Sequence, residues 1–160
     1  MRATDSQINS NCRITGYEVR TLLAIANYLK DQKTDLQRPQ PLDAKDPRMV
    51  AGKATYADNC SACHMSNGEG VARLFPSLKN SGSVLAEDPT TILRVVLRGT
   101  QAVATDAAPT GPAMPPFGWR LDDTQIAALA TYLRNTWGNA AGQVSKDQVK
   151  TQRAELASQP

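Results

Sequence analysis

A Cys-x-x-Cys-His motif, Cys60-Ser61-Ala62-Cys63-His64, is the part of this sequence with the clearest chemistry. Two thiols at this spacing reach both vinyl groups along one edge of a porphyrin, and the adjacent imidazole then points at the iron. The motif therefore predicts one covalently attached haem c. Cys60 and Cys63 would hold the porphyrin, and His64 would be an axial iron ligand.

Redox-active dithiols and zinc sites also use closely spaced cysteines. A thioredoxin-like dithiol is expected within a β-α-β unit, and the chain shows no sustained strand alternation. Tetrahedral zinc needs four ligands, whereas the nearby candidates are Cys60, Cys63 and the immediately adjacent His64. The remaining cysteine, Cys12, has no histidine at the required position. We therefore favour haem over both alternatives.

The second axial ligand cannot be another histidine of this chain, because His64 is the only one. Methionine, water and a foreign ligand remain open. Of the four methionines, Met1 is terminal, Met65 adjoins His64, and Met49 lies early in a predicted helix. Met114 instead lies in a Pro-rich segment, unlike a core-filling methionine on an apolar helix face. We predict that Met114 and His64 are the two metal ligands.

Haem propionates need donors, and Arg98 and Trp119 are candidates, together with Arg94 and Arg120. Guanidinium and indole groups suit carboxylates. A solvated position at the surface is the ordinary alternative for each of them.

Helix signals dominate the chain around these residues, which predicts an all-α fold. Two segments follow an Asp-Pro pair, which supplies a capping carboxylate and a proline pre-set for the first turn. Two more follow a capping box, formed by a polar residue and a glutamine three residues later. The predicted helices are residues 47–59, residues 90–98, the segment from Asp122 to Gly138, and a tail helix from Ser145. Between the second and third, residues 99–118 have no predicted structure, and long loops of this kind are uncommon unless functional.

Residues 17–31 also have helical periodicity, and the segment 23–30 is similar to the segment 127–134. This similarity reflects either the tail of a preceding domain of the same kind or convergent helix composition. A Pro-, Gln- and charge-rich linker follows. We expect three regions: an N-terminal helical extension and linker (1–45), the main domain (46–140) and a C-terminal tail helix (141–160).

Composition limits the classes of partner. The formal net charge is +3 without a basic run, so we expect no nucleic-acid partner. Aromatic residues make up 5% of the chain, which gives a thin core unless a buried porphyrin fills it. No apolar stretch approaches the roughly 20 residues of a membrane span, and no signal-peptide core is evident.

With these motifs in register, the chain resembles the class I cytochrome c family from residue 47 to about residue 137. The resemblance implies helices wrapped around one haem c. It also implies that Pro76, in a Pro-x-Leu motif with Leu78, orients His64 through its carbonyl group; a simple turn proline is the alternative. In that family the first and last helices pack through a glycine and aromatic residues, which correspond here to Gly52, Tyr56 and Tyr132.

A narrower resemblance is to the last haem domain of multihaem cytochrome c subunits of bacterial membrane-bound dehydrogenases, of the alcohol, gluconate or fructose dehydrogenase type. It rests on Phe75-Pro76-Ser77-Leu78, Asp88-Pro89, Val95-Val96-Leu97-Arg98-Gly99, Met114-Pro115-Pro116-Phe117 and Trp137-Gly138-Asn139 followed by Val144-Ser145.

The resemblance implies a periplasmic, non-enzymatic electron carrier. It would receive electrons from a dehydrogenase catalytic subunit and deliver them to a downstream quinone or oxidase system. A haem enzyme or ligand sensor with an open sixth iron position is the alternative, and a fragment and a freestanding carrier both remain open.

Overall fold

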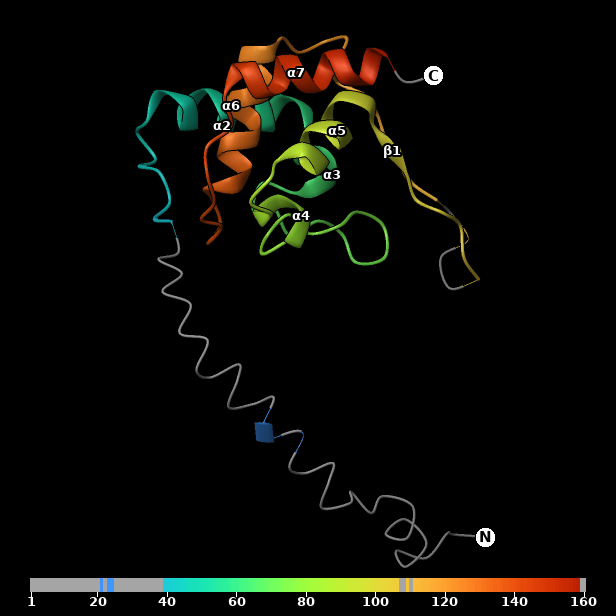
Figure 1. Cartoon of the computed structure of the whole chain (residues 1–160). Helices are drawn as coiled ribbons and strands as arrows, with labels where there is room; N and C mark the ends of the chain where they lie inside the picture. Colours follow the sequence, from blue (N-terminus) through green and yellow to red (C-terminus); the bar gives the residue numbers. More distant parts are fainter. Residues whose placement is uncertain (1–20, 22, 25–38, 107–108, 110, 159–160) are drawn as a thin grey trace, which may run out of the picture. The chain divides into compact units, whose positions relative to one another are not determined.

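The computed structural model describes residues 21, 23–24, 39–106, 109 and 111–158 (Figure 1). The chain divides into two units after Gln37. Of the helix expected over residues 17–31, the three described residues are helical; the remainder, like Cys12, lies outside the described residues. The second unit runs from Arg38 to Pro160. The three expected regions of the chain stay a prediction.

This unit is mainly helical, as the sequence predicts, with one small antiparallel sheet. None of the helices in the described ranges has the length and apolar character needed to cross a membrane. The elements in chain order are α2 (Pro47–Asn59), α3 (Ser61–His64), α4 (Gly82–Leu85), α5 (Thr90–Arg98), β1 (Thr100–Gln101), β2 (Ala113–Met114), α6 (Asp123–Arg134) and α7 (Lys146–Ala157).

The two Asp-Pro pairs begin α2 and α5 where the sequence places these helices. The Asp46 carboxylate accepts the backbone N–H of Arg48, and proline occupies the first turn of α2. At α5 the carboxylate of Asp88 accepts the N–H of Thr90 at 2.9 Å and also its hydroxyl at 2.7 Å. These bonds satisfy N–H groups that have no partner within the helix, which is why both helices begin at these residues.

Both capping boxes form, at the starts of α6 and α7. Asp122 accepts the N–H of Gln125, whose side-chain oxygen accepts the N–H of Asp122 in return. Ser145 and Gln148 make the same reciprocal pair. The predicted tail helix is therefore confirmed. Its face with Val149 and Leu156 is buried, and Figure 1 shows α7 (red) lying across α6 and α5.

The helices α2 and α6 cross in direct backbone contact at Gly52. A Cβ atom at this position would lie 2.2 Å from the Ala128 carbonyl oxygen and 2.5 Å from Tyr132 Cβ. One turn further along α2, the Tyr56 ring packs against the Tyr132 ring with centroids 5.7 Å apart. Trp137 joins them, at 5.0 Å from the Tyr56 ring. The packing that the family resemblance implied is therefore confirmed, with one more aromatic residue than expected.

Two features differ from the sequence prediction. α6 ends at Arg134, before Gly138, because the C-cap residue Asn135 already leaves the helical conformation, with φ −131° and ψ 18°. The left-handed backbone at Trp137 and Gly138 then turns the chain away from the helix. The stretch 99–118, expected to lack structure, contains the pair β1 and β2, with Thr100 opposite Met114. Strands of two residues are too short to show the alternation by which a strand is predicted.

We predict that Gly52→Ala destabilises the protein, although alanine ordinarily favours a helix over glycine by about 0.5–1 kcal/mol. The added methyl group must separate α2 from the α6 backbone, and overpacking of this kind costs about 1–3 kcal/mol. Gly82→Ala is the matched control, because a Cβ atom there meets nothing within 4 Å. Urea denaturation of both variants measures the effect. A Gly52 variant as stable as the control would contradict the close crossing.

Candidate functional site

The Cys-x-x-Cys-His motif lies at the junction of α2 and α3. The N–H of Cys60 donates to the Tyr56 carbonyl at 2.9 Å and so closes α2. The carbonyl of Cys60 then accepts the N–H groups of Cys63 and His64, at 3.2 and 2.9 Å, which makes α3 a single turn. Cys60 is buried, Cys63 is exposed, and both thiols are free. One helical turn therefore presents the two thiols and the imidazole together.

The His64 imidazole is buried and has one defined hydrogen bond. Its Nδ1 lies 3.0 Å from the carbonyl oxygen of Pro76. Because a carbonyl oxygen can only accept, Nδ1 must carry the proton, and the lone pair of Nε2 remains for another partner. A histidine that binds a metal through Nε2 has this arrangement. The structure therefore places Pro76 where the family resemblance implied.

The loop after the motif, residues 65–80, brings the Pro76 carbonyl to His64; we call it the histidine loop. Gly70 has a φ of 68°, and its N–H donates to the His64 carbonyl at 3.1 Å. A Cβ atom on Gly70 would lie 2.6 Å from the Pro76 carbonyl oxygen, so a side chain there would displace the acceptor. The N–H of Leu78 donates to the Gly68 carbonyl at 2.8 Å and closes the loop. Leu78, which is partly buried, packs against the core.

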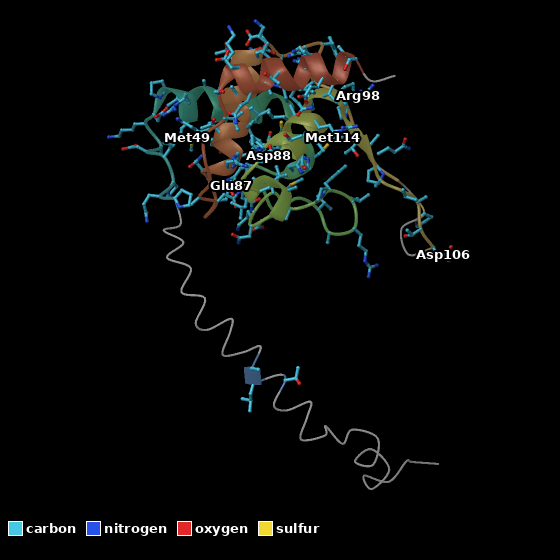
Figure 2. The ribbon with its side chains drawn as sticks, in the orientation of Figure 1. Met49, Glu87, Asp88, Arg98, Asp106 and Met114 are labelled. Carbon is cyan, nitrogen blue, oxygen red and sulfur yellow. The ribbon has the colours of Figure 1, made fainter. Side chains whose placement is uncertain are left out.

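Met114 lies on β2, in the segment of residues 99–118, which we call the methionine segment. It is partly buried and packs against the hydrophobic core. Figure 2 shows Met114 beside the helices of this unit, whereas Asp106 lies far out on the ribbon that the two strands begin. Gly99, with a φ of 73°, lets the Met114 carbonyl approach, because a Cβ atom there would lie 2.4 Å from that oxygen.

Hydrogen bonds to α5 and α7 hold the end of the methionine segment. Helix α5 leaves its last carbonyl groups without helical partners. Phe117 donates its N–H to the Val96 carbonyl at 2.9 Å, and Gly118 donates to Leu97 at 3.1 Å. From α7, the guanidinium of Arg153 donates to the Gly118 and Leu121 carbonyls. The backbone after Met114 is therefore tied to α5, and the backbone before it pairs with β1.

The four candidate propionate donors are all exposed. Trp119 is 81% exposed, and Arg94, Arg98 and Arg120 also lie at the surface. Their assignment to propionates stays a prediction.

The electrostatics of the thiols disfavour a redox dithiol. Burial, with a smaller contribution from Cys63, raises the pKa of Cys60 to about 11. A reactive dithiol needs a lowered thiol pKa, because the thiolate is the nucleophile. Among the residues that the structure describes, no three His, Cys, Asp or Glu side chains are grouped so that they could hold a metal ion. Two thiols and an imidazole with an available Nε2 on one helical turn instead fit a covalently held haem c.

Two buried polar residues have structural roles that the sequence did not indicate. Arg134 is the last residue of α6, and Asn139 follows five residues later. Arg134 is 1% exposed and donates to the carbonyls of Val84, Ala86 and Gly142, at 2.7–2.8 Å. Burial lowers the pKa of this guanidinium. Asn139 is equally buried and bonds to the histidine loop. The Trp-Gly-Asn motif pointed to Asn139 but indicated no role for it.

Comparisons with known proteins agree with this site. The model of the cytochrome c family matches residues 49–137. The chain is 35% identical over 130 residues to a gluconate 2-dehydrogenase cytochrome c subunit of Pantoea cypripedii, covering 75% of this chain and 30% of that protein. It is 39% identical over 104 residues to a quinone-type alcohol dehydrogenase cytochrome c subunit of Gluconobacter oxydans, covering 64% of this chain and 22% of that protein.

A similar protein from a different complex is the cbb3-type cytochrome c oxidase subunit CcoP of Azospirillum sp. It is 32% identical over 115 residues, covering 68% of this chain and 36% of that protein. The chain thus spans about a third or less of the length of these curated relatives. The family match covers more than half of the chain and includes the whole Cys-x-x-Cys-His motif. The chain therefore belongs to the cytochrome c family of haem-binding electron-transfer proteins.

Proposed function

We propose that this domain carries single electrons through one haem c. Cys60 and Cys63 would hold the porphyrin as thioethers, and His64 Nε2 and Met114 Sδ would bind the iron. When bound, this group supplies a ferric/ferrous couple, and two protein ligands leave no open position for oxygen or peroxide. The observation that carries the proposal is the 3.0 Å hydrogen bond between His64 Nδ1 and the Pro76 carbonyl. It prepares the imidazole beside the two thiols for ligation through Nε2.

The chain's own residues set the chemistry of such a centre. The Pro76 carbonyl fixes the tautomer and direction of the His64 imidazole and raises its basicity. A thioether ligand raises the reduction potential relative to a second imidazole, and burial of the site adds to this. We expect a positive potential, which suits an acceptor that works after a dehydrogenase.

The larger assembly is also part of the proposal. The relatives named above are subunits of dehydrogenases and of an oxidase, and each is about two to three times as long as this chain. We infer that this domain takes electrons from a dehydrogenase catalytic subunit and passes them to a quinone or oxidase system in the periplasm. The length of the encoding reading frame tests this placement. Further Cys-x-x-Cys-His motifs upstream would support a multihaem subunit, and a frame of this length alone would contradict it.

Met114→Leu tests the ligand set, because leucine keeps the volume but lacks the sulfur atom. The ferric protein should show the weak long-wavelength absorption band of a methionine–iron bond, and the variant should lose it and bind carbon monoxide once reduced. Met49→Leu is the matched control at a buried methionine on α2, and it should keep the band. A wild-type protein that lacks the band and binds carbon monoxide readily would favour the haem enzyme or sensor instead.

Gly70→Ala tests the role of Pro76, whose carbonyl cannot itself be removed by substitution. The new Cβ atom would push the Pro76 oxygen away from His64. A weaker hydrogen bond lowers the basicity of the imidazole and destabilises ferric iron, so we expect a more positive reduction potential.

Gly82→Ala is the control for Gly70→Ala. It makes the same chemical change on another segment of the chain, where a Cβ atom meets nothing within 4 Å. Potentiometric titration of both variants gives the comparison. Equal potentials would show that the Pro76 contact does not tune the iron.

A further inference from the structure

The backbone after α6 is strained at one point, and this strain turns two side chains onto the histidine loop. Trp137 has a φ of 54° and Gly138 a φ of 87°. A left-handed conformation at a residue other than glycine raises the free energy of the folded state by about 1–3 kcal/mol, so it persists only when contacts around the residue hold it there. Here the Trp137 ring lies against Gly68, where a Cβ atom would be 2.3 Å from the ring. Two residues later, Asn139 reaches the same loop.

The Asn139 side chain is fully bonded inside the protein. Its amide group donates to the Leu78 carbonyl at 2.9 Å and to the Leu133 carbonyl at 2.8 Å. Its oxygen accepts the N–H of Asn80 at 2.8 Å. The side chain is 1% exposed, so water cannot replace these bonds, and losing one leaves a buried group unsatisfied. Asn139 therefore clamps the end of the histidine loop to the end of α6.

This clamp acts close to the group that orients the iron ligand. Leu78, whose carbonyl Asn139 holds, is two residues from Pro76, and its N–H is bonded to Gly68. The position of the Pro76 carbonyl is therefore limited on one side by the turn at Gly70 and on the other by Asn139. We propose that Asn139 is a positioning residue for the iron centre, which fixes the hydrogen bond between Pro76 and His64 without touching either. This inference rests on the proposed function in that His64 binds the iron.

A second buried asparagine on the same stretch of chain gives the matched control. Asn135 donates to the Thr131 carbonyl at 2.9 Å and accepts the N–H of Leu42 at 3.2 Å. It therefore links α6 to the chain before α2 and not to the histidine loop. Truncating either asparagine removes buried hydrogen bonds, but only one of them belongs to the path that leads to His64.

The experiment compares Asn139→Ala and Asn135→Ala in the full chain with haem attached. Hydrogen exchange of the His64 Nδ1–H is followed by NMR in the reduced, diamagnetic state, and the reduction potential is measured on the same samples. We expect exchange to become about tenfold faster in Asn139→Ala, with a more positive potential. In Asn135→Ala, exchange should stay within about twofold of the wild type, with the potential unchanged. Equal acceleration in both variants, or none in Asn139→Ala, would overturn the positioning role.

If Asn139→Ala does not fold, Asn139→Asp replaces it in the same experiment. It keeps an oxygen for the Asn80 N–H but loses the donor to the Leu78 carbonyl, so exchange should again be faster than in the wild type. Wild-type exchange in Asn139→Asp would overturn the proposal. The absorption band tested with Met114→Leu reports separately on ligation. If the band is present and exchange does not change, only the role of Asn139 fails, whereas an absent band means that the proposed function itself fails.

Discussion

A histidine ring can bind a metal through either nitrogen, and the hydrogen bond from His64 Nδ1 to the Pro76 carbonyl leaves Nε2 as the available one. This bond joins groups 12 residues apart, across a loop that must turn back sharply. The loop does so with a short bridge between Val71 and Phe75. It also uses five residues in left-handed conformations, Met65, Gly68, Gly70, Arg73 and Asn80. The rest of the unit holds this loop in place. Without the loop, the His64 imidazole would have no defined direction.

Tyr56 connects the hydrophobic core to the site. Its ring packs between those of Tyr132 and Trp137, where α2 meets the end of α6. Its hydroxyl donates to the Met65 carbonyl, directly after His64. Burial raises the pKa of Tyr56, so the hydroxyl keeps its proton and remains a donor. A shift between α2 and α6 would therefore move the backbone next to His64, which couples packing at Gly52 to the geometry of the site.

The helix starts could be predicted from the sequence because each depends on groups within a few residues of one another. The Asp46–Arg48 cap and the Asp122–Gln125 box are local, and both form as predicted. The Cys-x-x-Cys-His motif is equally local, so its three side chains were found directly. The bond between Asn139 and Leu78 joins residues 61 apart, and no short pattern encodes such a contact. The pairing of β1 with β2 is missed for a similar reason, because each strand is only two residues long.

The early end of α6, which the sequence prediction missed, explains how several segments of this unit are held together. Had the helix continued to Gly138 as predicted, its side chains would follow one another around a single axis. Because it stops at Arg134 and the backbone turns left-handed at Trp137, Arg134 and the residues after it reach three separate segments. The contacts are Arg134 with Val84 and Ala86, Asn135 with Leu42, Trp137 with Gly68, and Asn139 with Leu78 and Asn80. Six consecutive residues thus fix the entry to α2, the connection from α4 to α5, and the histidine loop. The histidine loop is therefore held by Trp137 and Asn139, which follow α6, whereas the end of the methionine segment is held by backbone hydrogen bonds to the end of α5. The segments that carry the two expected iron ligands are thus fixed by different elements of the core, and α5 and α6, which contact each other, connect them.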